Sequence, residues 1–176
     1  PHGRASHAMT RLTPTAEMTL GPFFPREFAQ GANDLTIVAG KRAEGEVIEI
    51  TGTVSELDGK PLDNAVVEIW QADAKGRYDN PNFFGWGRAA TDANGKYVFR
   101  TVKPGGVGGR APHINFLVLY SGLMRHLQTT MFFEKGSDPV LDLVKQRDRL
   151  VAKREGTVYR FDLRLRGDGE TPFFDD

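Results

Sequence analysis

The residues best suited to chemistry in this sequence are one tyrosine and one histidine, each beside a loop. Tyr78 lies in a stretch rich in Gly, Asn and aromatic residues at 73–87, and His113 follows a glycine-rich run at 103–109. A phenolate and an imidazole are ligands that a non-haem metal site can use. The two residues therefore indicate a candidate metal site that is short of ligands.

Other common catalytic arrangements find little support. A serine nucleophile needs an adjacent base, but neither His113 nor His126 lies in a recognisable nucleophile motif. A phosphate-binding loop leads into a helix, whereas the glycines at 105–109 lead into a strand-like run. The chain has no cysteine, which excludes thiolate catalysis, disulfides and thiolate metal ligands.

Alternating runs predict the strands that position these residues. Ile48, Ile50 and Val54 fall on one face of the run at 47–54, and polar residues fall on the other. Turn residues such as Asp58-Gly59 separate several such runs. The predicted strands are residues 47–54, 65–72, 96–100, 114–120, 128–133 and 158–165.

One short helix interrupts this pattern. Asp138 can cap free amides, and Pro139 stands where its missing N–H costs nothing, so we predict a helix over 139–144. Repeated short strands with turns between them predict an all-β fold, an antiparallel β-sandwich or barrel.

Composition bounds the remaining possibilities. A chain of 176 residues with 39% hydrophobic content can bury one core, so we expect a single domain with appendages. Lys plus Arg and Asp plus Glu balance at 23 each, which favours neither nucleic acid nor an anionic membrane as partner. No apolar run approaches the roughly 20 residues that cross a bilayer, and we expect a cytoplasmic protein.

The N-terminal part lacks strand-like alternation. We interpret residues 1–9 as the remnant of an expression tag and leave His2 and His7 out of any site. Residues 10–45 are predicted to form an arm whose aromatic residues need cover from the main domain or a partner. The β-sandwich domain is predicted over 46–176.

Several separated motifs, in matching order and spacing, resemble the intradiol ring-cleavage dioxygenases. The motifs lie at residues 50–54, 58–59, 61–62, 66–73, 76–78, 91–95, 102–105 and 112–114. The resemblance implies a β-sandwich and an enzyme that uses ferric iron and dioxygen to open a catechol ring between its hydroxylated carbons. Further motifs resemble the alpha chains of the two-chain enzymes of this family, at residues 20–23, 111–115, 151–154, 159–162 and 169–174.

The family's catalytic chains hold iron with two tyrosines and two histidines, and this chain matches half of them. Tyr78 and His113 match one tyrosine and one histidine, whereas the second tyrosine position falls at Gly106 and Val107, and the second histidine position holds Asn115. One phenolate and one imidazole should hold Fe(III) poorly. The resemblance thus implies that this chain has neither a metal site nor catalytic residues, and that a catalytic beta subunit carries the iron.

As an alpha chain, this protein would complete the substrate pocket of its partner. The resemblance assigns Thr19 and Pro22 in the arm to that pocket, together with Ser121 before Gly122. The family often has an arginine at the position of Ser121, and serine cannot pair with a substrate carboxylate by charge. The expected ligands of the assembly are therefore an aromatic catechol acid and O₂, with the identity of the acid left open.

An alternative belongs to a different functional class. The turn and strand pattern from Gly52 to Phe99 also resembles small prealbumin-like β-sandwich modules that act in binding or adhesion without catalysis. A shared fold does not fix function. The N-terminal arm and the strand at 112–115 favour the dioxygenase interpretation, because such modules have no need of either.

Overall fold

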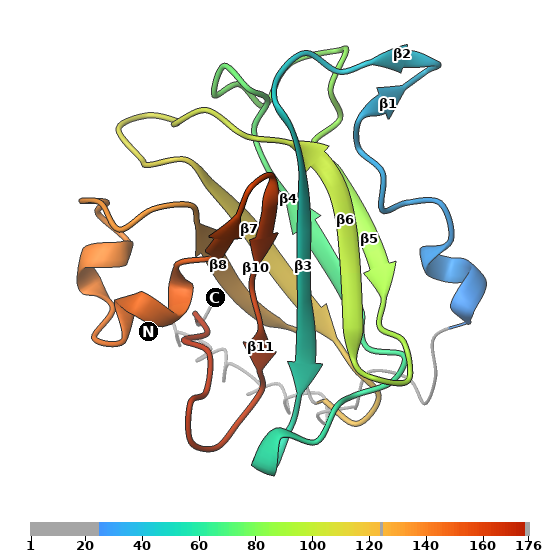
Figure 1. The fold of residues 1–176 in the computed structure, drawn as a ribbon, viewed down its shortest axis with the longest axis vertical. Coiled ribbons are helices and arrows are strands. Elements are labelled where there is room, and N and C mark those ends of the chain that lie inside the picture. Colours follow the sequence, from blue (N-terminus) through green and yellow to red (C-terminus); the bar gives the residue numbers. More distant parts are fainter. Residues whose placement is uncertain (1–24, 124, 175–176) are drawn as a thin grey trace, which may run out of the picture.

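The computed structural model describes residues 25–123 and 125–174, which form two β-sheets packed face to face. Figure 1 shows strands β3 and β6 of one sheet in front of β4 and β5 of the other. The all-β sandwich predicted from the sequence is confirmed. The described residues include no helix with the length and apolar character needed to cross a bilayer.

The five-stranded sheet is built around the long strand β3. Its strands are β3 (Val47–Ser55), β6 (Lys96–Val102), β9 (Lys153–Glu155), β10 (Val158–Arg160) and β11 (Leu163–Arg164). Strand β6 pairs with β3 in antiparallel register, with Ile50 opposite Phe99. Strands β10 and β11 run parallel to β3, so the sheet departs from the purely antiparallel arrangement that was predicted.

The four-stranded sheet is antiparallel throughout and carries the residues of chemical interest. Its order is β5 (Trp86–Ala90), β4 (Val66–Trp70), β7 (His113–Leu119) and β8 (Leu127–Phe132). In its register Trp70 on β4 lies opposite Trp86 on β5 and Asn115 on β7. His113 on β7 lies opposite Phe132 on β8.

The core fills the space between the sheets with the inward side chains of both. Ile48, Ile50 and Val54 of β3 are fully buried, as their alternation predicted. The largest fully buried aromatic side chains are Tyr97, Phe99, Phe116, Phe132 and Tyr159. Burying each apolar side chain contributes on the order of 1.5–3 kcal/mol, which makes this interior the main stabilising element.

The described part of the arm closes one side of the sandwich. It contains the 3-10 turn η1 (Arg26–Ala29) and the short hairpin of β1 (Ile37–Val38) and β2 (Lys41–Arg42). Between them, the carbonyls of Ala32 and Asn33 accept hydrogen bonds from the amides of Arg88 on β5 and Arg100 on β6. Leu35 is buried beside them. The arm therefore bridges the edge strands of the two sheets, which otherwise would expose unpaired backbone groups.

The predicted helix differs from the structure. The expected helix over 139–144 is a single 3-10 turn, η3 (Leu141–Leu143), because Val144 already has extended backbone angles. The carboxylate of Asp138 accepts hydrogen bonds from the amides of Val140 and Leu141, as expected of a cap. Further 3-10 turns are η2 (Leu57–Gly59) and η4 (Arg147–Leu150).

The predicted strand over 158–165 is broken in the middle, at Phe161 and Asp162. The Asp162 carboxylate accepts hydrogen bonds from the amide and hydroxyl of Thr53, and this side-chain contact replaces a rung of the ladder. The predicted loop over 73–87 ends two residues early, at Gly85, since Trp86 already opens β5.

Candidate functional site

The structure brings the chemically suited residues to one end of the four-stranded sheet. The ring of Tyr78 stacks on Trp70 with the ring centres 6.0 Å apart and the planes 7° from parallel. Trp70 pairs in register with Asn115, which shares the outward face of β7 with His113. Tyr78, from a loop, therefore lies at the same face and end of the sheet as His113 and Asn115, which both belong to β7.

Asp73 fixes the loop that carries Tyr78. Its buried carboxylate accepts hydrogen bonds from the amides of Lys75 and Arg77, from the Arg77 guanidinium and from the Asn80 side chain. Burial alone would raise the pKa of Asp73, but the hydrogen bonds from Arg77 and Asn80 lower the pKa to about 2. The carboxylate is thus ionised at neutral pH and stabilises the whole turn.

The Tyr78 loop touches the glycine-rich loop before β7 through backbone alone. The Gly105 amide donates to the Asp73 carbonyl at 2.9 Å. A Cβ atom at Gly76 would lie 2.0 Å from the carbonyl oxygen of Gly106, and one at Gly106 would lie 2.7 Å from that of Arg110. Contacts this short exclude any side chain, so glycine at 76 is required for the two loops to meet, and glycine at 106 is required for the turn within the glycine-rich loop.

Asp138 fixes the entry into β7 in the same way. This carboxylate is completely buried and accepts hydrogen bonds from Arg110 Nε at 2.7 Å and from the Ala111 amide at 2.9 Å. Burial raises the pKa of Asp138, but the contacts with Arg110 and the surrounding amides leave the pKa lowered overall. Two ionised aspartates therefore hold the two loops that flank the site.

The hydrogen bonds of His113 and Asn115 define which atoms they could offer a ligand. His113 is 6% exposed, and its Nδ1 lies 2.7 Å from the carbonyl oxygen of Ala111. Because a carbonyl only accepts, Nδ1 donates this hydrogen bond, and in the neutral imidazole the lone pair is then on Nε2. Asn115 Oδ1 accepts a hydrogen bond from the Thr130 hydroxyl at 3.0 Å. His113 is thus arranged as a metal-ligand histidine would be, whereas Asn115 is engaged within the sheet.

This set of donors does not fit a ferric ion. Tyr78 is the one phenol at these positions, and burial, partly opposed by the charge of Arg110, raises its pKa and so disfavours the phenolate. Val107 supplies no donor side chain at the second tyrosine position, and Asn115 is a neutral amide. Within residues 25–123 and 125–174, no three His, Asp or Glu side chains are grouped to hold a metal ion. We therefore derive no reaction step through a metal on this chain.

The predicted substrate-binding residues do not join this cluster. Ser121 follows the end of β7, in a turn closed by the hydrogen bond from the Leu123 amide to the Tyr120 carbonyl. The length of β7 alone separates His113 from Leu119 by roughly 20 Å, and Ser121 lies beyond that end of the strand. Thr19 and Pro22 lie outside the described residues. The role of all three in a pocket remains a prediction.

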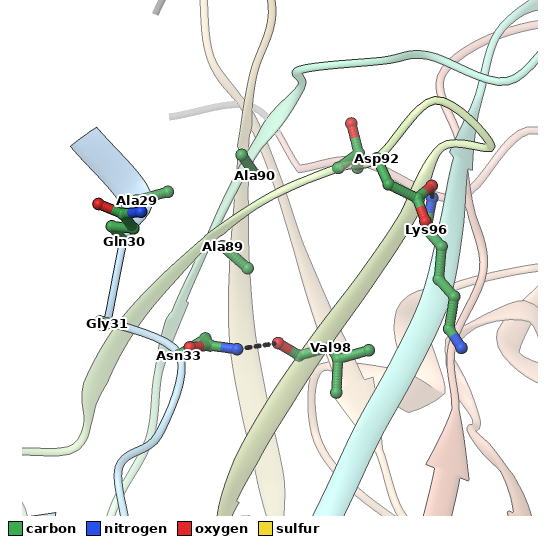
Figure 2. A pocket seen from close by; sticks show the side chains of 10 residues that line it. Ala29, Gln30, Gly31, Asn33, Ala89, Ala90, Asp92, Lys96 and Val98 are labelled. Carbon is green, nitrogen blue, oxygen red and sulfur yellow. Dashed lines mark hydrogen bonds between the residues drawn. The ribbon is translucent and has the colours of Figure 1, made fainter. Parts of the chain in front are cut away.

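A cavity of about 430 Å³ lies elsewhere, on the side of the sandwich that the arm closes (Figure 2). Small residues such as Gly31, Ala89 and Ala90 leave this space between η1, β5 and β6. Asp92 at its end accepts hydrogen bonds from the amides of Asn94 and Lys96 and builds the turn there. None of the predicted site residues that the structure describes lines the cavity, so we interpret it as a gap in packing.

The sequence analysis missed a row of aromatic side chains on the outer face of the four-stranded sheet. Trp70 contacts Phe84 edge to face at 6.4 Å, and Phe84 contacts Trp86 in the same way. Beyond them, the Arg88 guanidinium lies 4.9 Å from the Trp86 ring centre and 3.6 Å from that of Phe28 in the arm. The outward positions of β4 and β5 were a signal for this row, but the strand at 86–90 was not predicted.

Comparisons with known proteins agree with this architecture. The family model described as Dioxygenase matches residues 19–167, and the chain belongs to that family. Its fold and motifs are those of the intradiol dioxygenases, and it resembles the alpha chain of protocatechuate 3,4-dioxygenase.

The similar sequences include both chains of one enzyme. The protocatechuate 3,4-dioxygenase alpha chain of Burkholderia cepacia is 36% identical, over 95% of this chain and 100% of the relative. The alpha chain of Pseudomonas putida is 39% identical, over 76% of this chain and 78% of the relative. The beta chain of the Burkholderia cepacia enzyme is 39% identical, over 80% of this chain and 74% of the relative.

Solved structures support the fold. The dioxygenase domain of a dioxygenase and carbohydrate-binding fusion protein from Streptomyces sp. SirexAA-E superposes with a TM-score of 0.61 at 26% identity, covering 87% of this chain and 98% of that structure. Catechol 1,2-dioxygenase from Acinetobacter sp. ADP1 gives a TM-score of 0.59 at 26% identity, covering 82% of this chain and 60% of that structure.

Proposed function

We propose that this chain is the non-iron-binding alpha subunit of an enzyme like protocatechuate 3,4-dioxygenase. It would complete the substrate pocket of a catalytic beta subunit that holds Fe(III). The assembled enzyme would cleave 3,4-dihydroxybenzoate to 3-carboxy-cis,cis-muconate. In this reaction the bond between the two hydroxylated carbons breaks, and both atoms of O₂ enter the two new carboxylates.

The observation that carries the proposal is the incomplete donor set on an otherwise matching scaffold. The chain is similar to an alpha chain over 95% of its own length. Tyr78 and His113 stand at ligand positions, but Val107 and Asn115 supply no ionisable donor at the other two. A trivalent cation needs anionic oxygen donors to balance its charge. Iron chemistry must then be supplied by a partner.

The contribution of this chain would be to shape the pocket. The described arm is fastened to both sheets by backbone hydrogen bonds at Ala32, Asn33 and Leu35. An arm fixed in this way can present Thr19 and Pro22 to a neighbouring active site, because loops on a rigid scaffold often supply binding residues. Ser121 offers a hydroxyl and no charge, so recognition of the substrate carboxylate would come from other groups.

Metal analysis of the purified chain tests the proposal. The chain alone should contain far less than one iron per molecule and show no ring cleavage. Co-expressed with the protocatechuate 3,4-dioxygenase beta chain of the same organism, it should form a stable complex that contains iron and opens the ring. Stoichiometric iron with a red-brown tyrosinate colour, and ring cleavage by this chain alone, would refute the subunit assignment. Failure to form any complex with an iron-binding homologous chain would favour the prealbumin-like binding module.

Restoring the missing donors sharpens this test. Val107→Tyr combined with Asn115→His should increase the iron content of the isolated chain at least several-fold and produce a visible tyrosinate absorption band. His113→Ala added to that pair should remove the gain, since His113 Nε2 is the lone-pair nitrogen that this set would use. Equal iron content in all of these variants would show that the number of donor side chains does not determine how much iron the chain binds.

A further inference from the structure

A single residue of the four-stranded sheet, Arg88 on β5, holds the arm at two places. Its backbone amide donates a hydrogen bond to the carbonyl of Ala32 at 2.9 Å. Its guanidinium lies 3.6 Å from the centre of the Phe28 ring and donates to the Phe28 carbonyl at 3.4 Å. The amide therefore fixes the arm just after η1, and the guanidinium fixes η1 itself.

The guanidinium of Arg88 is in turn held by the sheet. Glu68 lies opposite Arg88 on β4, and its carboxylate accepts hydrogen bonds from Nε at 2.7 Å and from a terminal nitrogen. The ring centre of Trp86, on the same face of β5, lies 4.9 Å from the guanidinium. The side chains of Arg88 and Glu68 are only 18% and 19% exposed. A cation held in this way offers the Phe28 ring one fixed position.

The turn η1 has little other support. Among its described side chains, Ala29 alone is buried, whereas Glu27 and Phe28 are exposed. An alanine side chain is one methyl group, so its burial contributes little. The cavity of about 430 Å³ between η1, β5 and β6 is lined by Ala29 and Gln30 and leaves this side of the turn unfilled (Figure 2). The position of η1 therefore depends on Arg88 more than on apolar packing.

The rest of the described arm is attached independently of the Arg88 side chain. The Asn33 carbonyl accepts a hydrogen bond from the Arg100 amide, and the Leu35 amide donates to the Arg100 carbonyl, both at 2.8 Å. Leu35 is also buried. Replacing the side chain of Arg88 should therefore release η1 while residues 33–35 stay in place.

We propose that Arg88 is a positioning residue for the substrate pocket of the assembled enzyme. Pro22 and Thr19 stand four and seven positions before Arg26, where η1 begins. The guanidinium fixes η1, and η1 sets where the preceding segment starts. This inference rests on the proposed function, in which Thr19 and Pro22 line the pocket, and it adds the residue that aligns them. Arg88 acts through the arm and contributes no group to the pocket itself.

Loss of this alignment should appear as weaker substrate binding. A pocket wall contacts the substrate in the ground state and in the transition state alike, so displacing the wall raises KM more than it lowers kcat. A loss of folded enzyme would instead lower the activity per total chain and leave KM unchanged. The two kinetic parameters therefore distinguish positioning from a merely structural role.

The kinetic test uses the complex of this chain with its beta chain, and 3,4-dihydroxybenzoate as substrate. Arg88→Met should raise KM at least fivefold and change kcat per bound iron less than twofold. Arg88→Lys keeps a cation beside Glu68 and should raise KM less than half as much. Arg100→Met is the matched control, since Arg100 also faces the arm but its side chain forms an exposed ion pair with Asp34. It should change KM less than twofold.

Phe28→Leu tests the same contact from the side of the arm. It should raise KM about as much as Arg88→Met does, because it removes the ring on which the guanidinium lies. The double variant should raise KM no further, since the two side chains act as one unit. If the two effects multiply, Arg88 does not act through the arm and the inference is overturned.

Trypsin tests the anchoring of η1 on the isolated chain, without a partner. Native proteins are cleaved where they open locally. Cleavage after Arg26, inside η1, should be at least fivefold faster in Arg88→Met than in the parent chain. Arg100→Met should stay within twofold of the parent rate. The digestions are run far below the melting temperature of each variant, so that global unfolding does not contribute.

The outcomes separate this inference from the proposed function. If cleavage after Arg26 is no faster in Arg88→Met, Arg88 does not hold η1 and the inference is overturned, whatever the partner. If cleavage is faster but KM of the complex stays within twofold of the parent value, Arg88 holds the arm without aligning the pocket. The inference is then overturned while the subunit assignment stands. If the parent chain forms no active complex with the beta chain, the proposed function and the inference fail together.

Discussion

The two outer faces of this sandwich have opposite character. On the five-stranded sheet, Thr51 and Thr53 alternate with core residues, and Arg160 pairs with Asp162 at the surface. On the four-stranded sheet, the outward positions of β4 and β5 carry Trp70 and Trp86. The inward faces are alike, since both supply the same apolar core.

The difference lies in how much apolar area each outer face exposes to solvent. A surface of threonine and charged residues keeps one face soluble and exposes no large apolar area. An exposed aromatic row contributes little to the stability of an isolated chain and exposes it to aggregation. It lies at the end of the sheet that also carries Tyr78 and Asn115, and the five-stranded sheet has no such row among the described residues. The following predictions test how far the two faces differ.

The largest expected effect concerns Asp138, which anchors the loop at the end of the four-stranded sheet. Asp138→Ala should lower the free energy of unfolding by about 3 kcal/mol, because it leaves Arg110 and three backbone amides without their shared acceptor. Asp162→Ala on the five-stranded sheet should cost less, about 1 kcal/mol, since its ion pair with Arg160 and its hydrogen bonds from Thr53 are exposed and water can replace them. Urea denaturation measures both. Equal losses of unfolding free energy in the two variants would show that the two aspartates stabilise their sheets to the same extent.

Acid should weaken the turn that carries Tyr78. The pKa of Asp73 is lowered to about 2 in the folded chain, below its usual value, so its contribution is complete above about pH 4 and is lost as the pH falls through 2. The contribution should be on the order of 2 kcal/mol, reduced by screening because the Arg77 side chain is 49% exposed. The stability difference between the parent chain and Asp73→Asn should shrink between pH 4 and pH 2. A constant difference across this range would contradict the assignment.

The smallest expected effect compares two arginines that face the arm. Arg88→Met should destabilise the chain by about 1–2 kcal/mol, because Arg88 is bonded to a half-buried Glu68 and lies over the Phe28 ring. Arg100→Met on β6 should cost less than about 0.5 kcal/mol, since its ion pair with Asp34 is exposed and 3.3 Å long. Thermal unfolding of both variants checks this order. The reverse order would show that the arm is fastened mainly to the five-stranded sheet.

Local patterns were enough to predict most of the fold. The alternation of Ile48, Ile50 and Val54 predicted β3, and the turn residues after Thr91 predicted the start of β6. Such patterns depend on near neighbours in the chain, and a buried face with a period of two leaves little freedom of register. The resemblance to intradiol dioxygenases, based on separated motifs, is confirmed by the family match over residues 19–167.

The features that were missed depend on contacts between distant residues. The break at Phe161 arises from Asp162 bonding to Thr53, which lies 109 positions earlier in the chain. The expected helix after Asp138 stops after one turn, and short isolated helices are marginal in any case. The row of aromatic side chains on the outer face of the four-stranded sheet combines residues from a loop and two strands, so no single stretch of sequence displays it.

The backbone contact between Gly76 and Gly106 bears on how such a chain could change over evolutionary time. A tyrosine at position 106 would need a Cβ atom 2.7 Å from the Arg110 carbonyl oxygen, and any residue but glycine at 76 would collide with Gly106. A single mutation at 106 therefore cannot supply a phenol without rebuilding the turn between Gly106 and Arg110. The two glycines thus restrict which sequences this pair of loops can accept, and a new oxygen donor at this end of the sheet could arise at position 107 but not at 106.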